Sequence, residues 1–310
     1  DNSMVKEIVS VTPEPLVSVI MNCFNGEKYL RESIDSVLNQ TYQNWEIIFW
    51  DNQSTDNSAE IFNEYNDLRF KYFYAHKHTW LYEARNYAIE KSNGEFIAFL
   101  DVDDWWLPSK LEKQISLFSD MEIGFTCGNY LLKNENKKKT WKALENTIPT
   151  GWVLDELLES YFVGLLTLMV RRSALDSLEY LCDSRYHVMG DLDLVIRLSI
   201  NWKLGAVQES IAVCRKHESN ELIKHRTRHV NELECWIKEM SQVKEIRSSS
   251  SFHYIKINYT YQKAMDQVLQ LHKMNAFRLS LNLPWSLIKI RLWVAILSPI
   301  FIIKRIKKHY

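Results

Sequence analysis

The sequence predicts an α/β fold, in which a mostly parallel central sheet is flanked by helices and followed by a C-terminal helical appendage. In the first 120 residues, short apolar runs rich in β-formers alternate with segments of helical periodicity. The predicted strands are continuous apolar runs, which is typical of a sheet covered on both faces. Beyond Glu221 only helical patterns remain. With 310 residues, 46% of them hydrophobic, the chain can form one large domain and such an appendage.

Four strand–helix repeats are expected within residues 16–118. The expected strands are 16–22, 45–51, 70–75 and 95–101, and the expected helices are 26–40, 56–65, 81–94 and 108–118. Asp56 or Asn57 can cap the second helix, and Pro108 precedes the fourth. Such alternation implies parallel strands joined by helical crossovers.

The pattern changes after about Met121. A charged turn between two β-rich runs predicts a hairpin over 123–144, and 165–175 predicts a strand leading into a short helix. Helical periodicity follows over 190–202, and a final strand is expected over 204–217.

We therefore divide the chain into four parts: a tail or cloning remnant over 1–15, the α/β domain over 16–220, the helical appendage over 221–284, and a basic, apolar segment over 285–310. The last part contains no acidic residue and two tryptophans, Trp285 and Trp293, so we expect it to lie on an anionic membrane surface. A final helix packed on the protein, with a solvated basic tail, is the alternative. The longest apolar run, Leu292 to Ile303, contains Pro299 and is shorter than the roughly 20 residues that span a bilayer.

Bulk composition excludes several classes of protein. The formal net charge of −1 argues against a nucleic-acid binder. The five cysteines are scattered and form no CxxC pair, which argues against a zinc module or a disulfide framework. No apolar stretch follows a basic start, so we expect no secretory signal and a cytoplasmic protein.

Three polar clusters follow predicted strands, at Asn22–Asn25, Asp51–Ser54 and Asp101–Asp104. Ligands of parallel sheets bind beyond the carboxyl ends of the strands, so we expect the three clusters to line one cleft. In "AFLDVDDWWLP" three aspartates lie within four positions and repel one another. They either cap the helix after Pro108 or surround a cation.

The order of four segments makes the sequence resemble the inverting, non-processive, bacterial type of family 2 glycosyltransferase, which has the GT-A fold. The resemblance covers roughly residues 16 to 220 and rests on "VSVIMNCFNGEKYLRESIDSVLNQTYQNWEIIFWDNQSTDNS", "EARNYAIEKSNGEFIAFLDVDDWWLPSKLEKQ", "GDLDLVIRL" and "CRKHESN". It implies transfer of a sugar from a nucleotide-sugar donor, with a UDP-sugar favoured.

The resemblance assigns the aspartates to a Mn²⁺ or Mg²⁺ ion that neutralises the leaving diphosphate. Asp103 is expected to ligate the metal directly, while Asp101 supports it through water or holds the ribose. Asp104 is expected to be a helix cap or to face the acceptor. His217, in "CRKHESN", matches a histidine that joins the metal or the diphosphate in some relatives.

The nucleotide is expected at the ends of the first two strands. Phe24 matches the aromatic that lies against the base, and its neighbours Asn22 and Asn25 belong to the same loop, where Asn22 can hydrogen-bond the base edge. Asp51 and Asn52 match the pair that reads a pyrimidine; a common family form has Asp at the second position, so the base stays open. Arg85 resembles the arginine near the diphosphate or the base. The alternatives are ordinary packing for Phe24, a loop carboxylate that hydrogen-bonds local amides for Asp51, and a surface salt bridge on a helix for Arg85.

The general base is expected in "MGDLDLVIRL". Asp191 matches the carboxylate that takes the proton of the acceptor hydroxyl, and Asp193 matches a supporting acid. Gly190 stands where Glu is usual. Asp191 as a plain helix cap is the alternative.

The QxxRW segment and membrane helices of processive synthases are missing from the sequence, so we expect transfer of a single sugar. The acceptor is then a glycan or a lipid-linked saccharide of bacterial surface polysaccharide biosynthesis, met at the inner face of the cell membrane. A nucleotidyltransferase or a non-catalytic nucleotide-sugar-binding protein remains the alternative.

Overall fold

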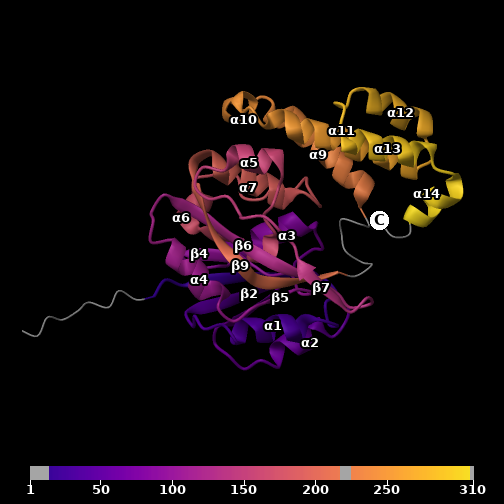
Figure 1. The fold of residues 1–310 in the computed structure, drawn as a ribbon. Coiled ribbons are helices and arrows are strands. Elements are labelled where there is room, and N and C mark those ends of the chain that lie inside the picture. Colours follow the sequence, from indigo (N-terminus) through magenta and orange to yellow (C-terminus); the bar gives the residue numbers. More distant parts are fainter. Residues whose placement is uncertain (1–13, 217–224, 308–310) are drawn as a thin grey trace, which may run out of the picture.

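The computed structural model describes residues 14–216 and 225–307 and places a nine-stranded sheet at the centre of the molecule (Figure 1). Its strand order is β3-β2-β1-β4-β8-β6-β9-β5, with β7 paired to β6. Four strands are parallel to one another, as expected: β1 (Val17–Cys23), β2 (Trp45–Asp51), β3 (Phe70–Tyr74) and β4 (Phe96–Phe99). The polar clusters therefore follow strands that end on the same side of the sheet.

The second half of the sheet is mixed. The strand β8 (Met169–Arg171) is antiparallel to β4 and to β6 (Ile123–Asn134), and β6 is parallel to β9 (Lys203–Lys216). The expected hairpin is confirmed, because β7 (Lys139–Lys142) pairs antiparallel with β6. The two-residue strand β5 (Trp105–Trp106), which directly follows the aspartates, pairs with β9.

Helices cover both faces of the sheet (Figure 1). They are α1 (Leu30–Leu38), α2 (Ser58–Asn63), α3 (Leu81–Glu90), α4 (Lys110–Leu117), α5 (Leu154–Glu159), α6 (Arg172–Asp176) and α7 (Gly190–Asn201), with a 3₁₀ turn at Leu165–Thr167. Side chains alternate along β1: Val19 joins the core with α1, and Ile20 joins the core with α3 and α7. Both faces are thus filled, as the apolar strand runs predicted.

The C-terminal helices form two layers with different cores (Figure 1). They are α9 (Arg226–Met240), α10 (Lys244–Ser248), α11 (Phe252–Leu269), α12 (Lys273–Leu281), α13 (Leu287–Leu297) and α14 (Ile300–Lys307). Leu233, Trp236, Ile246 and Ile255 join the main core, whereas the second half of α11 builds a separate core with α12–α14. Within residues 14–216 and 225–307, no helix has the length and apolarity to cross a bilayer.

Candidate active site

The aspartate turn over 101–104 connects β4 to β5. The amide of Asp104 donates to the carbonyl of Asp101 (3.1 Å), and Asp104 Oδ1 accepts from the amide of Arg215 (2.8 Å). Helix α4 begins only at Lys110, without a side-chain cap. The helix-cap interpretation of these aspartates, including the one expected for Asp104, is therefore wrong.

The turn concentrates negative charge. Burial, followed by the neighbouring carboxylates of Asp103 and Asp101, raises the pKa of Asp104 well above its usual range. A divalent cation relieves such repulsion, and carboxylate oxygens are ligands that Mg²⁺ and Mn²⁺ prefer, so the residues fit the expected metal. In the described part of the chain, no group of three His, Cys, Asp or Glu side chains is arranged to hold a metal ion. The expected ligand His217 lies outside the described residues.

Arg215, at the end of β9, is a buried cation beside the turn. It pairs with Glu32 and Glu135, donates to the carbonyl of Asp103 (3.1 Å), and lies over the rings of Tyr29 and Trp105 (4.1 and 4.7 Å). Sequence reasoning missed this residue. Its guanidinium fixes the backbone that carries Asp103 and Asp104.

Arg85 on α3 joins the turn from the other side. Its side chain is buried, and its Nη2 donates to Asp101 Oδ1 (2.6 Å). Its Nη1 is buried without any hydrogen-bond partner. The surface ion pair considered for this residue is therefore wrong, and one donor remains for a ligand, because an orphaned buried N–H is costly.

Asp191 lies at the start of α7, close to the same arginine. Tyr82 donates to its Oδ1 (3.1 Å), Tyr161 donates to its Oδ2 (3.4 Å), and the Arg85 guanidinium lies over the Tyr82 ring (4.8 Å). Burial raises the pKa of Asp191 above its ordinary value, while the charge of Arg85 opposes that rise. Asp101 and Asp191 thus flank Arg85 in one site.

Gly190 explains a departure from the common family pattern. A Cβ at this position would lie 2.6 Å from three atoms of the Tyr82 ring. The glycine lets the ring pack against the first turn of α7, where its hydroxyl reaches Asp191. A Glu here and Tyr82 in its present place exclude each other.

Asp193 has a different task from the supporting role expected of it. It is fully buried, pairs with Arg197 (2.8 Å) and accepts from Trp236 Nε1 on α9 (3.0 Å). It connects α7, the helix that carries Asp191, to the C-terminal helices.

The expected nucleotide side has two exposed or unsatisfied groups. Phe24 is 53% exposed, so the alternative that it is ordinary core packing is wrong, and its ring centroid lies 4.5 Å from that of His78. Asn22 is buried, and neither polar atom of its amide has a partner. His78 Nδ1 is hydrogen-bonded with the carbonyl of Asn52 (2.8 Å), a neighbour that sequence reasoning did not identify.

The other three expected nucleotide residues have protein partners. Asp51 accepts from the amide of Ser54 (2.7 Å) and the hydroxyl of Tyr72 (2.6 Å). The Asn52 side chain bonds both backbone groups of Thr79, and Asn25 Oδ1 accepts from the amide of Thr55 (2.8 Å). These side chains shape the loops, and their role toward a base stays a prediction.

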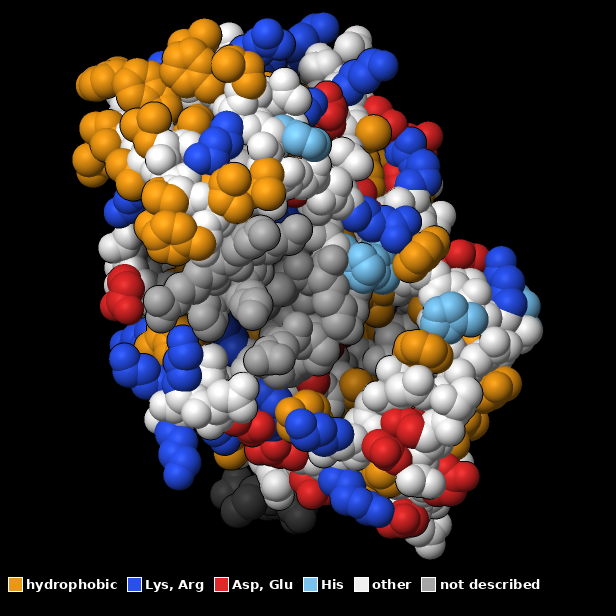
Figure 2. All heavy atoms as spheres, turned by 90° about the vertical axis from the view of Figure 1, so that its right-hand side faces the viewer, with side chains coloured by type: hydrophobic (Ala, Val, Ile, Leu, Met, Phe, Trp, Pro, Cys, Tyr) orange, Lys and Arg blue, Asp and Glu red, His pale blue; other side chains and the backbone are white. Residues whose placement is uncertain are grey.

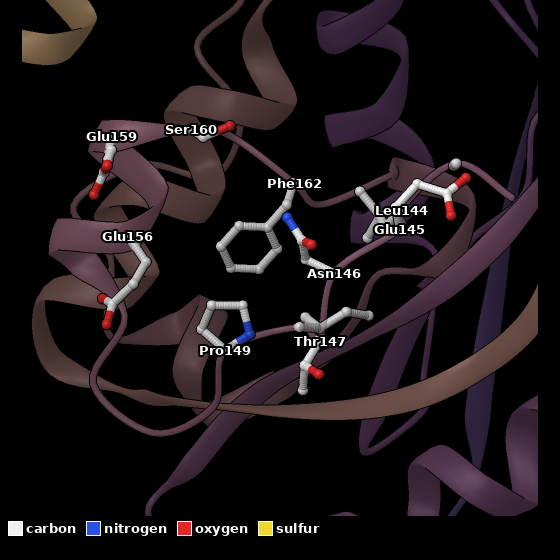
Figure 3. A pocket seen from close by; sticks show the side chains of 11 residues that line it. Leu144, Glu145, Asn146, Thr147, Pro149, Glu156, Glu159, Ser160 and Phe162 are labelled. Carbon is white, nitrogen blue, oxygen red and sulfur yellow. The ribbon is translucent and has the colours of Figure 1, made fainter.

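A cavity of about 370 Å³ lies next to the site (Figure 3). The loop over 143–149 and the end of α5 form its walls, and the Phe162 ring points into it (Figure 3). The preceding residue, Tyr161, instead reaches Asp191. None of the site residues expected from the sequence lines this cavity.

Solved structures share the arrangement of strands and helices. Residues 1–349 of S. aureus TarS, in complex with UDP-GlcNAc, superpose with a TM-score of 0.64 over 91% of this chain and 79% of that chain, at 18% identity. The mannosyltransferase PcManGT from Pyrobaculum calidifontis, in complex with GDP-Man and Mn²⁺, superposes with a TM-score of 0.59 over 92% of this chain and 86% of that chain, at 14% identity. The fold is thus the expected GT-A fold.

Sequence comparison adds the family. The model described as Glycosyl transferase family 2 matches residues 18–177, and the chain belongs to that family.

Three curated relatives illustrate the range of matches. The chain is 37% identical over 165 residues to the Escherichia coli UDP-Glc:alpha-D-GlcNAc-diphosphoundecaprenol beta-1,3-glucosyltransferase WfgD, covering 53% of this chain and 64% of that protein. It is 34% identical over 161 residues to the putative teichuronic acid biosynthesis glycosyltransferase TuaG of Bacillus subtilis, covering 51% of this chain and 63% of that protein. It is 32% identical over 214 residues to the uncharacterized glycosyltransferase MJ1057 of Methanocaldococcus jannaschii, covering 65% of this chain and 71% of that protein. The chain spans less than two thirds of the length of WfgD and of TuaG.

Proposed function

We propose that the protein is a metal-dependent, inverting glycosyltransferase that moves one sugar from a UDP-sugar to a hydroxyl of a glycan or lipid-linked saccharide. The observation that carries the proposal is the placement of both Asp101 and Asp191 close to the buried Arg85. A donor diphosphate at the aspartate turn and an acceptor hydroxyl at Asp191 then meet around one anomeric carbon.

Asp191 is the general base in this proposal. Its raised pKa strengthens it as a proton acceptor, and the hydroxyls of Tyr82 and Tyr161 fix the orientation of its carboxylate. It takes the proton of the acceptor hydroxyl as that oxygen bonds to the anomeric carbon. The bond from that carbon to the diphosphate breaks on the opposite face, so the configuration inverts.

Asp103, with Asp101 and His217, would hold Mn²⁺ or Mg²⁺ together with oxygens of the diphosphate. The metal supplies charge that stabilises the departing diphosphate. The free Nη1 of Arg85 supplies a further donor to the same group. The Mn²⁺ complex of the mannosyltransferase neighbour supports a divalent metal.

The nucleotide would lie between the loops after β1 and β2. We place the base against Phe24, with the Asn22 amide at its edge and Asp51, Asn52 and Asn25 holding the loops around it. UDP is favoured because the TarS neighbour was solved with UDP-GlcNAc and because WfgD is named for a UDP-Glc donor.

The acceptor proposal rests on the relatives. WfgD is named for a diphosphoundecaprenol-linked acceptor, and TuaG for teichuronic acid biosynthesis. We therefore propose a role in bacterial surface polysaccharide biosynthesis, at the cytoplasmic face of the cell membrane, where such a lipid-linked acceptor would be met.

The test compares Asp191→Asn with Asp176→Asn, which removes an exposed carboxylate on α6. We expect Asp191→Asn to lower turnover at least about 100-fold, in line with the loss of a general base. Affinity for UDP, measured by calorimetry with Mn²⁺, should stay within about twofold, and Asp176→Asn should resemble the wild type in both assays. Loss of UDP binding in Asp191→Asn contradicts the assignment and moves this carboxylate to the donor side.

A further inference from the structure

Three C-terminal helices leave a continuous set of apolar side chains uncovered. We call it the α12–α14 surface. Its exposed members are Met274, Phe277, Leu281, Trp285, Leu287, Ile288, Ile290, Val294, Leu297, Ile300, Phe301 and Ile302. Figure 2 shows hydrophobic side chains gathered on the upper part of this face of the molecule. Monomeric proteins rarely leave so large an apolar patch without a partner.

Helix α13 makes the case for a partner most directly. Its sequence, LIKIRLWVAIL, is apolar around most of its circumference. Leu292 and Ile296 face the small core built with α11, while Leu287 and Leu297 are 74% and 81% exposed. A helix that is apolar all round is normally buried on all sides, and the residues that the structure describes cover only one side of α13.

Charge indicates the nature of the partner. No Asp or Glu follows Asp266, whereas eight basic residues do: Lys273, Arg278, Lys289, Arg291, Lys304, Arg305, Lys307 and Lys308. Lys273 and Lys289 donate to the carbonyls of Ser298 (2.6 Å) and Leu283 (2.8 Å) inside the helical layer. Arg278 and Arg291 are exposed beside the apolar side chains.

We propose that the α12–α14 surface docks onto an anionic lipid bilayer, with its helices lying in the headgroup interface. Helix α13 has 11 residues, and a bilayer-spanning helix needs roughly 20, so the helix can lie in the surface but cannot cross it. Trp285, which is 73% exposed, suits the interface. A second copy of the chain fits less well, because pairing two such surfaces brings like charges together.

The α12–α14 surface begins earlier in the chain than the segment 285–310, for which the sequence predicted membrane contact. Met274, Phe277 and Leu281 recur at helical spacing on α12 and enlarge the surface.

The experiment measures binding of the full chain to vesicles by flotation, with no donor or metal present. We expect binding to phosphatidylglycerol-containing vesicles, weaker binding at high salt, and little binding to phosphatidylcholine alone. The variant L297E/F301E should bind at least about tenfold more weakly, which corresponds to about 1.4 kcal/mol. The control L68E/M121E adds the same charge at two exposed apolar positions of the α/β domain and should bind like the wild type.

Two outcomes overturn the proposal. One is wild-type protein that stays unbound on anionic vesicles. The other is a wild-type dimer, seen by light scattering, that L297E/F301E converts to monomer while vesicle binding is equal in both. Equal melting temperatures of the variants exclude misfolding as the cause of lost binding. Because the assay involves no transfer, its failure is distinguishable from failure of the proposed function.

Discussion

The hydroxyl of Tyr82 sets both the place and the basicity of the Asp191 carboxylate. It donates to Oδ1, and this bond favours the ionised form of Asp191, against the effect of burial. In its proposed role as general base Asp191 works only when ionised, so we expect turnover to fall on the acid side as Asp191 becomes protonated. Because its pKa is raised, that fall occurs at higher pH than for an exposed aspartate.

Tyr82→Phe removes a donor to the ionised carboxylate, so the pKa of Asp191 should rise further. We expect the acid limb of the kcat–pH profile to move to higher pH, and kcat at neutral pH to fall. Tyr87→Phe is the matched control, because Tyr87 lies on the same helix and its hydroxyl donates to Glu83 instead. An unshifted acid limb in Tyr82→Phe would show that this hydroxyl does not act through the base.

Gly190→Ala tests the same contact from the other side. The added methyl group meets the Tyr82 ring at 2.6 Å, so the ring must move away from α7. We expect kcat to fall at least about tenfold while KM for the donor changes little, since the aspartate turn is untouched. The control is Gly151→Asn at a half-buried β-bridge residue with φ of 84°, where a Cβ meets nothing within 4 Å and Asn tolerates the conformation. A matching loss of donor affinity in Gly190→Ala would place the damage elsewhere.

Sequence patterns found the charged groups of the site but not all their partners. Asp101, Asp191 and Arg85 were identifiable because the segments that carry them resemble those of family 2 glycosyltransferases. Tyr82 precedes Arg85 by three residues on one helix, and this spacing could have identified it. Tyr161 and Arg215 could not be found, because only the folded chain brings residues so distant in sequence beside Asp191 and Asp103.

Helix α9 is anchored in the core of the α/β domain. Trp236 is fully buried in the main core and donates to Asp193 on α7, two residues beyond Asp191. The helix that starts the appendage thereby stabilises the helix that carries Asp191.

Trp236→Ala should lower the free energy of unfolding by about 3–5 kcal/mol, because it opens a large cavity and removes a partner of a buried carboxylate. Urea denaturation measures this loss. Trp285→Ala, at a 73% exposed position, should change it by less than about 0.5 kcal/mol. Similar small changes in both variants would show that α9 does not stabilise the domain.

Element types were predictable from periodicity, but some pairings were not. The four parallel strands and α7 follow from continuous apolar runs and helical spacing. The strand β5 has only two residues, which are too few to show a periodic pattern. It forms because Trp105 and Trp106 pair with β9 in the folded chain. Likewise, nothing in the sequence of α9 specifies that it completes the core of the domain.

The whole molecule should respond to its donor through the metal. A ligand at 100 times its Kd stabilises the native state by about 2.7 kcal/mol. We therefore expect UDP or a UDP-sugar with Mn²⁺ to raise the melting temperature in a thermal-shift assay, and chelator to remove most of that rise. Asp103→Asn should lose the Mn²⁺-dependent part, whereas Asp176→Asn should keep it. A full shift in chelator contradicts the metal assignment.

The core shared between the sheet and the C-terminal helices has a consequence for biosynthesis. Trp236, Ile246 and Ile255 belong to the same core as side chains from β1 and β4, and those of β1 lie more than two hundred residues earlier in the chain. While the chain is still on the ribosome, the domain keeps an apolar face open until this stretch has left the exit tunnel. The α/β domain therefore completes its core only after α9, α10 and α11 have been synthesised, and a chain truncated before α9 should be prone to aggregate.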